Sequence, residues 1–181
     1  MTPEDLLSKL QTKLGEQYIG RPPVDSWHPE RRGNIDIVID ETGAWWHDGT
    51  AFARQSLVEL FAKILRREGD DYFLVTPVEA LQITVKDVPF IATELVVEGS
   101  GADTDLYFTT NVGDVVLADL DHPLSMRAAK PYLHVRAGLE ARLSTSVYYQ
   151  LAEYVQGDLE DDVDTYVVHS QGHPFKLASG I

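Results

Sequence analysis

Two arginines, each shortly before a segment with helical spacing, are the residues of this sequence best suited to bind an anion. Arg54 and Arg142 both fall at or near a predicted helix N-terminus. A cation placed there opposes the helix dipole, unless a bound anion compensates. An anion would find both the guanidinium fork and the free N–H groups of the helix start. The alternative is an ion pair with a carboxylate that is nearby in sequence, such as Asp48 or Glu140.

The residues just before the first arginine add further candidates for ligand contact. Trp46 offers an aromatic face for stacking, and His47 and Gly49 lie on the loop that leads to Arg54. His47 is also a weak candidate for a general base, because its ordinary pKa lies near neutrality. Thr76 and Ser170 each stand at the end of a predicted strand, where a hydroxyl group could contact the same ligand.

Signatures of metal binding and of known enzyme classes are absent. His169 and His173 have a spacing that would bind zinc on a helix, but they flank a strand and turn, and no HExxH pattern occurs. The sequence has no GxxxxGK phosphate loop, no GxSxG elbow and no GxGxxG helix start. We therefore expect no metal and no cofactor, and a binding protein rather than an enzyme.

Composition narrows the range of partners. The chain has 181 residues, a formal net charge of −14 and no cysteine. The excess of acids argues against a nucleic-acid partner, which requires a basic surface. The lack of cysteine excludes disulfides and cysteine-ligated metals and fits a cytoplasmic location. No apolar run is long enough to cross a membrane, so no membrane association is expected. Between Lys86 and Arg127 there are acids but no Lys or Arg, which would permit a basic protein partner.

The elements that would position these residues form a repeat. Residues 1–32 predict an amphipathic helix over 2–14, followed by a loop rich in Pro and Gly. Residues 33–98 then predict a strand pair, a helix that continues through Arg66 and Arg67 to Gly69, and further strands. Residues 99–181 predict the same order again, with a helix that Ser144 or Thr145 caps. We therefore expect a duplicated α+β fold, in which each half is one helix on an antiparallel sheet.

Several of these segments together resemble the bacterial domain-of-unknown-function family 1285 (DUF1285). The similarity rests on the runs that start at Gly33, Arg54, Tyr72, Val135 and Val168, and it extends over nearly the whole chain after residue 20. The resemblance implies a duplicated core whose C-terminal half is similar to a pleckstrin-homology (PH) fold. It also implies a signalling role and a pocket for a nucleotide-like molecule between the halves. The positions that match the family are Trp46, His47, Gly49, Arg54, Thr76, Pro77, Arg142, Ser170 and Gly172.

Three functions are compatible with these observations. The first is a sensor or binding module, in which Arg54 and Arg142 hold a small anionic ligand such as a nucleotide. The second is a PH-like adaptor that binds another protein through an exposed edge or the acidic hairpin. The third is a hydrolase or transferase that acts on a phosphorylated metabolite with His47 as base. The sequence does not specify the ligand or the oligomeric state.

Overall fold

The computed structural model describes residues 5, 8, 20–157 and 165–179. It separates into two compact units, Met1–Asp87 and Val88–Ile181. The predicted helix over residues 2–14 lies outside the described residues except for Asp5 and Ser8, which are helical. The sequence pattern put the division between the halves near residue 98, whereas the structure divides the chain after Asp87. The strand over 90–98 belongs to the second unit, because it pairs only with strands of that unit.

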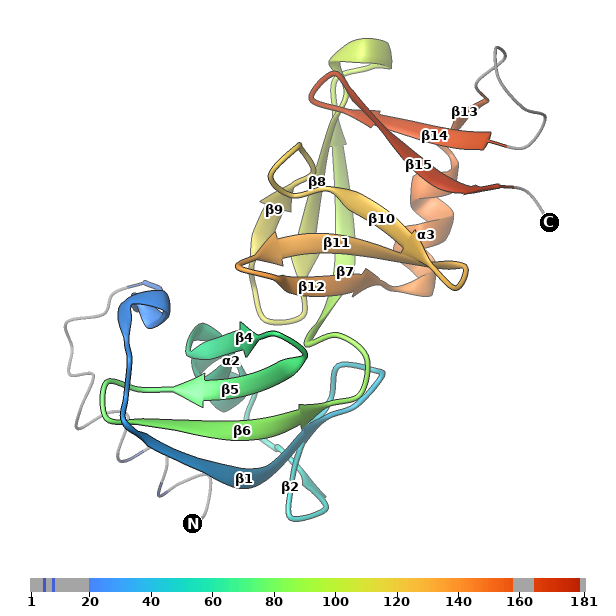
Figure 1. Cartoon of the computed structure of the whole chain (residues 1–181). Helices are drawn as coiled ribbons and strands as arrows, with labels where there is room; N and C mark the ends of the chain where they lie inside the picture. The colour runs from blue at the N-terminus through green and yellow to red at the C-terminus, as the bar shows by residue number, and fades with distance from the viewer. Residues whose placement is uncertain (1–4, 6–7, 9–19, 158–164, 180–181) are drawn as a thin grey trace. The chain divides into compact units, whose positions relative to one another are not determined.

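The first unit is built on a six-stranded sheet whose two central strands are parallel (Figure 1). All other neighbouring strands in it are antiparallel. Across the sheet the order is β3 (Thr50–Ala51), β2 (Trp45–His47), β1 (Arg31–Ile39), β6 (Glu79–Val85), β5 (Asp71–Val75) and β4 (Leu65–Glu68). Alternation in β1 places Ile37 and Ile39 in the core, as the strand period predicts.

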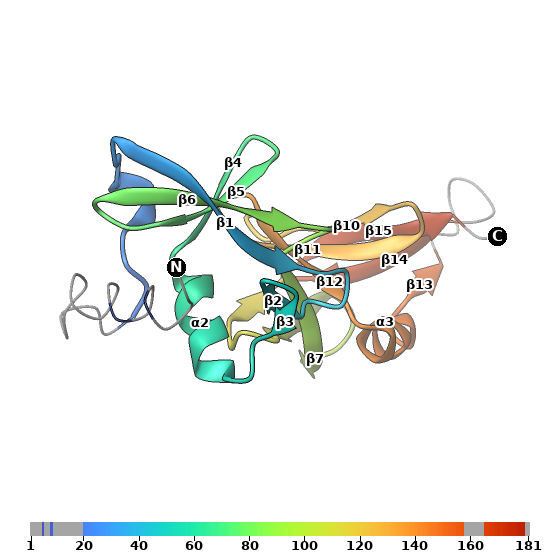
Figure 2. The same cartoon turned by 90° about the horizontal axis from the view of Figure 1, so that it is seen from below.

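One helix, α2 (Gln55–Lys63), covers one face of this sheet, as Figures 1 and 2 show. It buries Leu57, Val58, Phe61 and Ala62. The prediction that this helix extends through Arg66 and Arg67 is wrong, because the helix ends at Lys63 and the arginines lie on β4. The segment Leu-Arg-Arg-Glu fits a short strand, since Leu65 points into the core and the polar side chains remain partly exposed.

The second unit contains a sheet with the same topology. Its strands lie in the order β10 (Leu124–Arg127), β11 (Lys130–Arg136), β12 (Leu139–Leu143), β7 (Phe90–Glu98), β8 (Asp105–Thr110) and β9 (Val115–Leu117). When each unit is numbered from its own first strand, both sheets read 4-5-6-1-2-3. In both, the first and sixth strands form the central parallel pair. The halves are therefore duplicated, but each sheet is mixed rather than antiparallel as the sequence suggested.

The helices interrupt the two sheets at different points. In the first unit α2 follows the third strand, whereas α3 (Thr145–Ala152) follows the sixth strand of the second. Helix α3 packs against β7 and buries Val147 and Leu151. A third, smaller sheet then completes the second unit, with strands β13 (Gln156–Gly157), β14 (Thr165–Ser170) and β15 (His173–Ser179). The chain is thus a mixed α+β protein, mostly sheet, in two duplicated halves.

Candidate functional site

Four of the predicted site residues lie on one short segment of the first unit. Trp46, His47 and Gly49 belong to the β2–β3 hairpin, and Arg54 follows it directly. His47 pairs with Thr50, so the turn has only two residues, Asp48 and Gly49. Both have positive φ angles, 47° and 74°. This is the backbone of a type I′ hairpin turn, which explains Gly49 without a ligand.

Aromatic packing fixes this segment against α2. The ring of Trp45 lies 6.1 Å from that of Phe52 and 6.2 Å from that of Phe61, and the last two are 5.8 Å apart. Phe61 lies on α2 and is fully buried. The cluster therefore joins the hairpin to the helix and holds the connection between them, which contains Arg54, in place.

The polar atoms of Trp46 and His47 have neighbours within the hairpin. The indole Nε1 of Trp46 donates a hydrogen bond to Asp40 Oδ2 over 2.8 Å. The Nδ1 atom of His47 lies 3.4 Å from Asp48 Oδ2, and the His47 side chain is only 11 % exposed. Trp46 is half-buried, so part of its ring remains accessible for stacking.

Asp40 organises the turn that precedes the hairpin. Its Oδ1 atom accepts hydrogen bonds from the Thr42 amide (2.8 Å), the Thr42 hydroxyl (2.6 Å) and the Ala44 amide (3.1 Å). Burial by itself would raise the pKa of Asp40. The hydrogen bonds from Thr42, Trp46 and Ala44 outweigh burial and hold the pKa below its usual value. Asp40 thus remains ionised and fixes the orientation of Trp46.

Arg54 occupies the N-cap position of α2, and its side chain is exposed. No side chain caps this helix, and its first turn contains no acid. Every other arginine has a polar or aromatic partner, whereas the guanidinium of Arg54 has none among the described residues. The expected alternative, a pair with Asp48, is not formed, since Asp48 faces His47. The start of α2 therefore has no side-chain cap and carries a cation that is unengaged among the described residues.

Arg142 lies in a different setting. It is on strand β12, half-buried, opposite Tyr132 of β11 and two residues before the N-cap of α3. Because α2 and α3 follow different strands of the two sheets, Arg54 and Arg142 do not occupy equivalent positions of the duplicated fold. Glu140, its expected partner in the alternative, forms a bidentate pair with Arg127 at 2.7 and 3.0 Å. The symmetry argument for a shared ligand is therefore not supported.

The Thr76 hydroxyl serves the turn between β5 and β6. It accepts hydrogen bonds from the Glu79 amide (3.1 Å) and the Val78 amide (3.4 Å), and it donates to the Glu79 carbonyl (3.2 Å). Thr76 is 4 % exposed. These contacts account for a hydroxyl residue here through the requirements of a tight turn.

Ser170 and Gly172 likewise have roles within the fold. The Ser170 hydroxyl is completely buried and accepts a hydrogen bond from the Leu106 amide at 3.1 Å, which ties β14 to β8. Gly172 and Gln171 form the two-residue turn between β14 and β15, both with positive φ. Thr76, Ser170 and Gly172 thus lie at turns and strand ends of two different units.

The two histidines with zinc-like spacing do not meet. His169 pairs across the hairpin with Pro174, and His173 pairs with Ser170. Neighbouring positions of a strand face opposite sides, so the two imidazoles point to opposite faces of the hairpin. Within the described part of the chain, no three His, Asp or Glu side chains gather in a way that could hold a metal ion.

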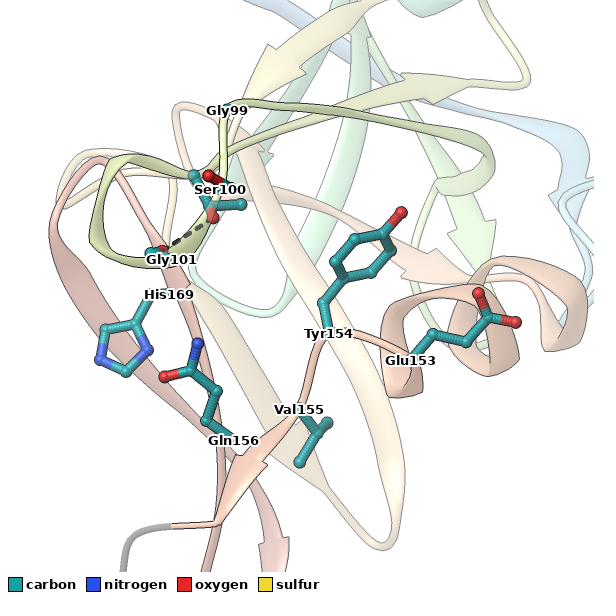
Figure 3. A pocket seen from close by; sticks show the side chains of 9 residues that line it. Gly99, Ser100, Gly101, Glu153, Tyr154, Val155, Gln156 and His169 are labelled. Carbon is teal, nitrogen blue, oxygen red and sulfur yellow. Dashed lines mark hydrogen bonds between the residues drawn. The ribbon is translucent and has the colours of Figure 1, made fainter.

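A pocket that no motif of the sequence indicates lies wholly in the second unit (Figure 3). Its cavity is about 260 Å³. The lining comes from three segments, which are residues 99–101 with Thr104 before β8, residues 153–156 after α3, and His169 on β14. No pattern in the sequence shows that these segments converge, so the sequence does not predict this pocket.

The fold and the sites together define a class, a two-unit α+β protein of duplicated six-stranded sheets. The chain belongs to the DUF1285 family. Residues 22–88 match the DUF1285 N-terminal domain, a domain of unknown function, and residues 89–177 match the C-terminal domain of the same family. A search of curated proteins gives no match.

Two solved structures are similar to this chain. A DUF1285 family protein from Silicibacter pomeroyi DSS-3 has 36% sequence identity and a TM-score of 0.83, with 94% of each chain covered. A DUF1285 family protein from Shewanella baltica OS155 has 27% identity and a TM-score of 0.56, with 65% of this chain and 90% of that chain covered. No α-helix in the described residues is long and apolar enough to cross a membrane.

Proposed function

We propose that this protein binds a small anionic ligand, of nucleotide-like character, at the start of α2. The observation that carries the proposal is Arg54, whose guanidinium has no partner among the described residues although it sits where a cation is unfavourable. A bound phosphate or carboxylate would pair with the guanidinium and would be favoured by the positive end of the helix dipole. In this proposal the protein is a cytoplasmic sensor, and ligand binding transmits a signal.

The neighbouring residues divide into ligand contacts and supports. Trp46 supplies a stacking face, held in orientation by Asp40, and His47 supplies an imidazole edge. Gly49 contributes by shaping the turn that leads to Arg54. In the second unit, Arg142, Ser170 and Gly172 remain predicted ligand positions, as does Thr76 in the first. The contacts inside the fold explain Thr76, Ser170 and Gly172 better than a ligand does.

A thermal-shift screen with nucleotides and inorganic phosphate tests the proposal. A ligand present at about 100 times its Kd stabilises the native state by about 2.7 kcal/mol. We expect the best ligand to raise the Tm of the wild type and to have little effect on Arg54→Ala. The matched control is Lys63→Ala, which removes an exposed cation from the other end of the same helix and should leave the shift unchanged. Equal shifts in wild type and Arg54→Ala would refute an anion site at α2.

The contribution of Arg142 needs its own measurement. If Arg142 contributes to ligand binding, Arg142→Ala weakens binding of the best ligand found in the screen. No effect of Arg142→Ala would leave Arg54 as the anion-binding residue and remove Arg142 from the predicted ligand positions.

A protein-interaction function of PH-like type is the second candidate, and a partly exposed apolar row supports it. Val96, Tyr107 and Leu117 lie in register across β7, β8 and β9, and Val96 is 52% exposed. Glu98 pairs with Asp105 beside this row, which favours a basic partner. If this function is correct, Val96→Glu disrupts capture of a partner while Arg54→Ala does not. A hydrolase or transferase with His47 as base has the least support, because no nucleophile beside His47 and no cluster of metal ligands is found among the described residues.

A further inference from the structure

The outward face of β7, β8 and β9 carries a row of apolar side chains. Side chains alternate between the two faces of a strand. The inward ones are buried in the core of the second unit, and they include Leu95, Leu106, Phe108 and Val116. On the outward face, Val96, Tyr107 and Leu117 lie side by side, because they are register partners across the three strands. Val96 is 52% exposed and the other two are half-buried, so the row is accessible to a partner.

Acidic side chains border this row on both sides. Glu94 stands two residues before Val96 on β7 and Glu98 two residues after it, so both share its outward face and both are exposed. Glu98 pairs in register with Asp105 of β8, whose carboxylate accepts a hydrogen bond from the Gln171 side chain at 2.6 Å. None of these three carboxylates has an ion-pair partner among the residues that the structure describes. Their negative charge is therefore available to a partner.

The charge of this surface excludes a second copy of the chain as its occupant. Between Lys86 and Arg127 the sequence contains acids but no Lys or Arg, and the whole chain has a net charge of −14. Two copies that met through this face would bring the same carboxylates together, and like charges that face each other across an interface are unfavourable. A partner that fits the face combines apolar side chains with basic ones.

The spacing of the row matches the turns of an α-helix. Neighbouring strands lie about 4.8 Å apart, and the pitch of an α-helix is about 5.4 Å. A helix that lies across the strands would place one apolar side chain from each successive turn over Val96, Tyr107 and Leu117. The acids stand two residues further along the strands, about 7 Å to either side. Lys and Arg side chains on the flanks of the helix are long enough to reach them.

We propose that this face binds an amphipathic helix of another protein, whose apolar stripe is bordered by basic residues. The inference rests on the protein-interaction function given above as the second candidate, names its partner, and does not involve Arg54. An extended peptide that paired with the edge of β9 would meet a strand of only three residues. It would also lie two strands away from Glu94 and Glu98, so the helix makes better use of the acids.

Binding of a defined helical peptide to the full-length chain tests the proposal. The probe is a labelled synthetic peptide of about 15 residues, with one stripe of leucines between lysines, in salt of about 0.15 M. We expect saturable fluorescence anisotropy and shifts of the amide NMR signals of Val96, Tyr107 and Leu117. A twin with glutamates in place of the lysines, and a scrambled basic peptide without the stripe, should bind about tenfold more weakly or less. Equal binding of either peptide would overturn the proposal.

Reversal of charge on the face should weaken binding more than the same change elsewhere. Glu94→Lys with Glu98→Lys should weaken binding of the probe by about tenfold or more, because the new lysines would oppose those of the peptide. The matched control is Asp25→Lys with Glu30→Lys, which alters the net charge equally at two exposed acids of the first unit. This control should change the affinity by no more than about twofold. An equal loss in both pairs would show attraction by net charge alone and would overturn the site.

The contribution of the apolar row is tested without a change of charge. Val96→Asn should weaken binding of the probe by about fivefold, whereas Val78→Asn, at a valine of the first unit that is 45% exposed, should not. The charge variants retain Val96, so a folding defect in Val96→Asn leaves their test in force. Wild-type affinity in the charge variant, or dimers of the wild type that Val96→Asn dissociates, would overturn the proposal. Failure of the probe to bind overturns the helix as partner, whereas the protein-interaction function fails only if Val96→Glu also leaves capture of a partner unchanged.

Discussion

The two units share one strand order but treat the start of their helices differently. In the second unit the Ser144 hydroxyl accepts a hydrogen bond from the Val147 amide at 3.3 Å and caps α3. In the first unit Arg54 stands at the same position of α2, where its side chain caps nothing. A serine at this position stabilises a helix, whereas an arginine is unfavourable there. A position that lowers stability without a partner in the fold is a reasonable place to look for a ligand.

The comparison also shows what the duplication preserved. Both sheets keep the central parallel pair and the order of six strands, yet α2 is inserted after the third strand and α3 after the sixth. The sheet is therefore the repeated element, and the helices are additions that each unit places separately. Arg54 and Arg142 both precede a helix, but the two helices are not equivalent in the duplicated fold. The two arginines therefore do not occupy equivalent positions.

The largest expected difference between the units is in how much the buried side chains of each helix contribute to the free energy of unfolding. Phe61→Ala removes the centre of the Trp45–Phe52–Phe61 cluster, and we expect a loss of about 3–5 kcal/mol in the free energy of unfolding. Leu151→Ala in α3 removes a smaller, fully buried side chain and should cost about 2–4 kcal/mol. Urea denaturation of both variants measures the two values. A larger loss for Leu151→Ala would show that α3, not α2, is the more important helix for its unit.

Much of the fold could be predicted from the sequence, because strand alternation and turn residues are local signals. The strand pair before α2, the strands after it and the cap of α3 by Ser144 are confirmed. Sheet order, in contrast, depends on pairing between distant segments, so the parallel central pairs could not be inferred. The end of α2 was misjudged because Leu65, Arg66 and Arg67 have helix propensity as good as that of the helix itself. Tertiary pairing with β5 overrides this local preference.

The next largest expected effect is the loss of stability when a carboxylate that accepts hydrogen bonds within a turn is removed. Such a carboxylate is present in each unit. Replacing Asp40 by alanine deprives the Thr42 and Trp46 donors of their acceptor, which should cost about 1.5–3 kcal/mol. Burial raises the pKa of Asp40 and is the largest single influence on it. The hydrogen bonds together outweigh burial, so the pKa lies below its usual value. The stabilisation of the native state by ionised Asp40 is therefore complete above the pKa that Asp40 has in the unfolded chain, about 3.9. This stabilisation is lost as the pH falls through the lower pKa that Asp40 has in the folded protein. Unfolding measured between pH 2 and 7 should show a smaller acid-induced loss in Asp40→Ala than in wild type.

The second unit provides the control for this prediction. Asp119 accepts hydrogen bonds from the Asp121 and His122 amides at 2.9 and 2.7 Å. Burial raises the pKa of Asp119, but these bonds and the His122 side chain lower it overall. Asp119→Ala should thus reduce the acid sensitivity in the same direction. If stability falls with decreasing pH in both variants as it does in the wild type, other carboxylates dominate acid unfolding.

A smaller effect comes from exchanging the two helix starts. Ser144→Ala should destabilise the protein by about 1 kcal/mol, because the cap of α3 is lost. Arg54→Ser should stabilise it by about 0.5–1 kcal/mol, since it adds a cap to α2 and removes an unfavourable cation. The same substitution should abolish the response to the anionic ligand, and thermal shifts with and without that ligand measure both effects. An Arg54→Ser protein that is less stable without ligand would indicate that Arg54 supports the fold and not a ligand.

The candidate site was harder to predict than the fold. Arg54 could be singled out, because a cation before an amphipathic helix is visible in the sequence. Thr76 and Ser170 were chosen for their hydroxyl groups, yet both hydroxyls hydrogen-bond to backbone amides of their own unit. The pocket around His169 could not be anticipated, since its lining comes from segments up to about seventy residues apart that converge only in three dimensions.

The smallest expected effect distinguishes two hairpin turns, one in each unit. The β2–β3 turn is Asp48-Gly49, whereas the β10–β11 turn is Ala128-Ala129, and all four residues have positive φ. Alanine adopts this conformation less readily than asparagine or glycine. The double change Ala128→Asn with Ala129→Gly should therefore stabilise the second unit by about 0.4–1 kcal/mol, and Gly49→Ala should destabilise the first by a similar amount. Urea midpoints of the two variants measure these shifts. A destabilised Asn-Gly variant would imply that the alanines stabilise this turn by contacts that outweigh the strain of their backbone.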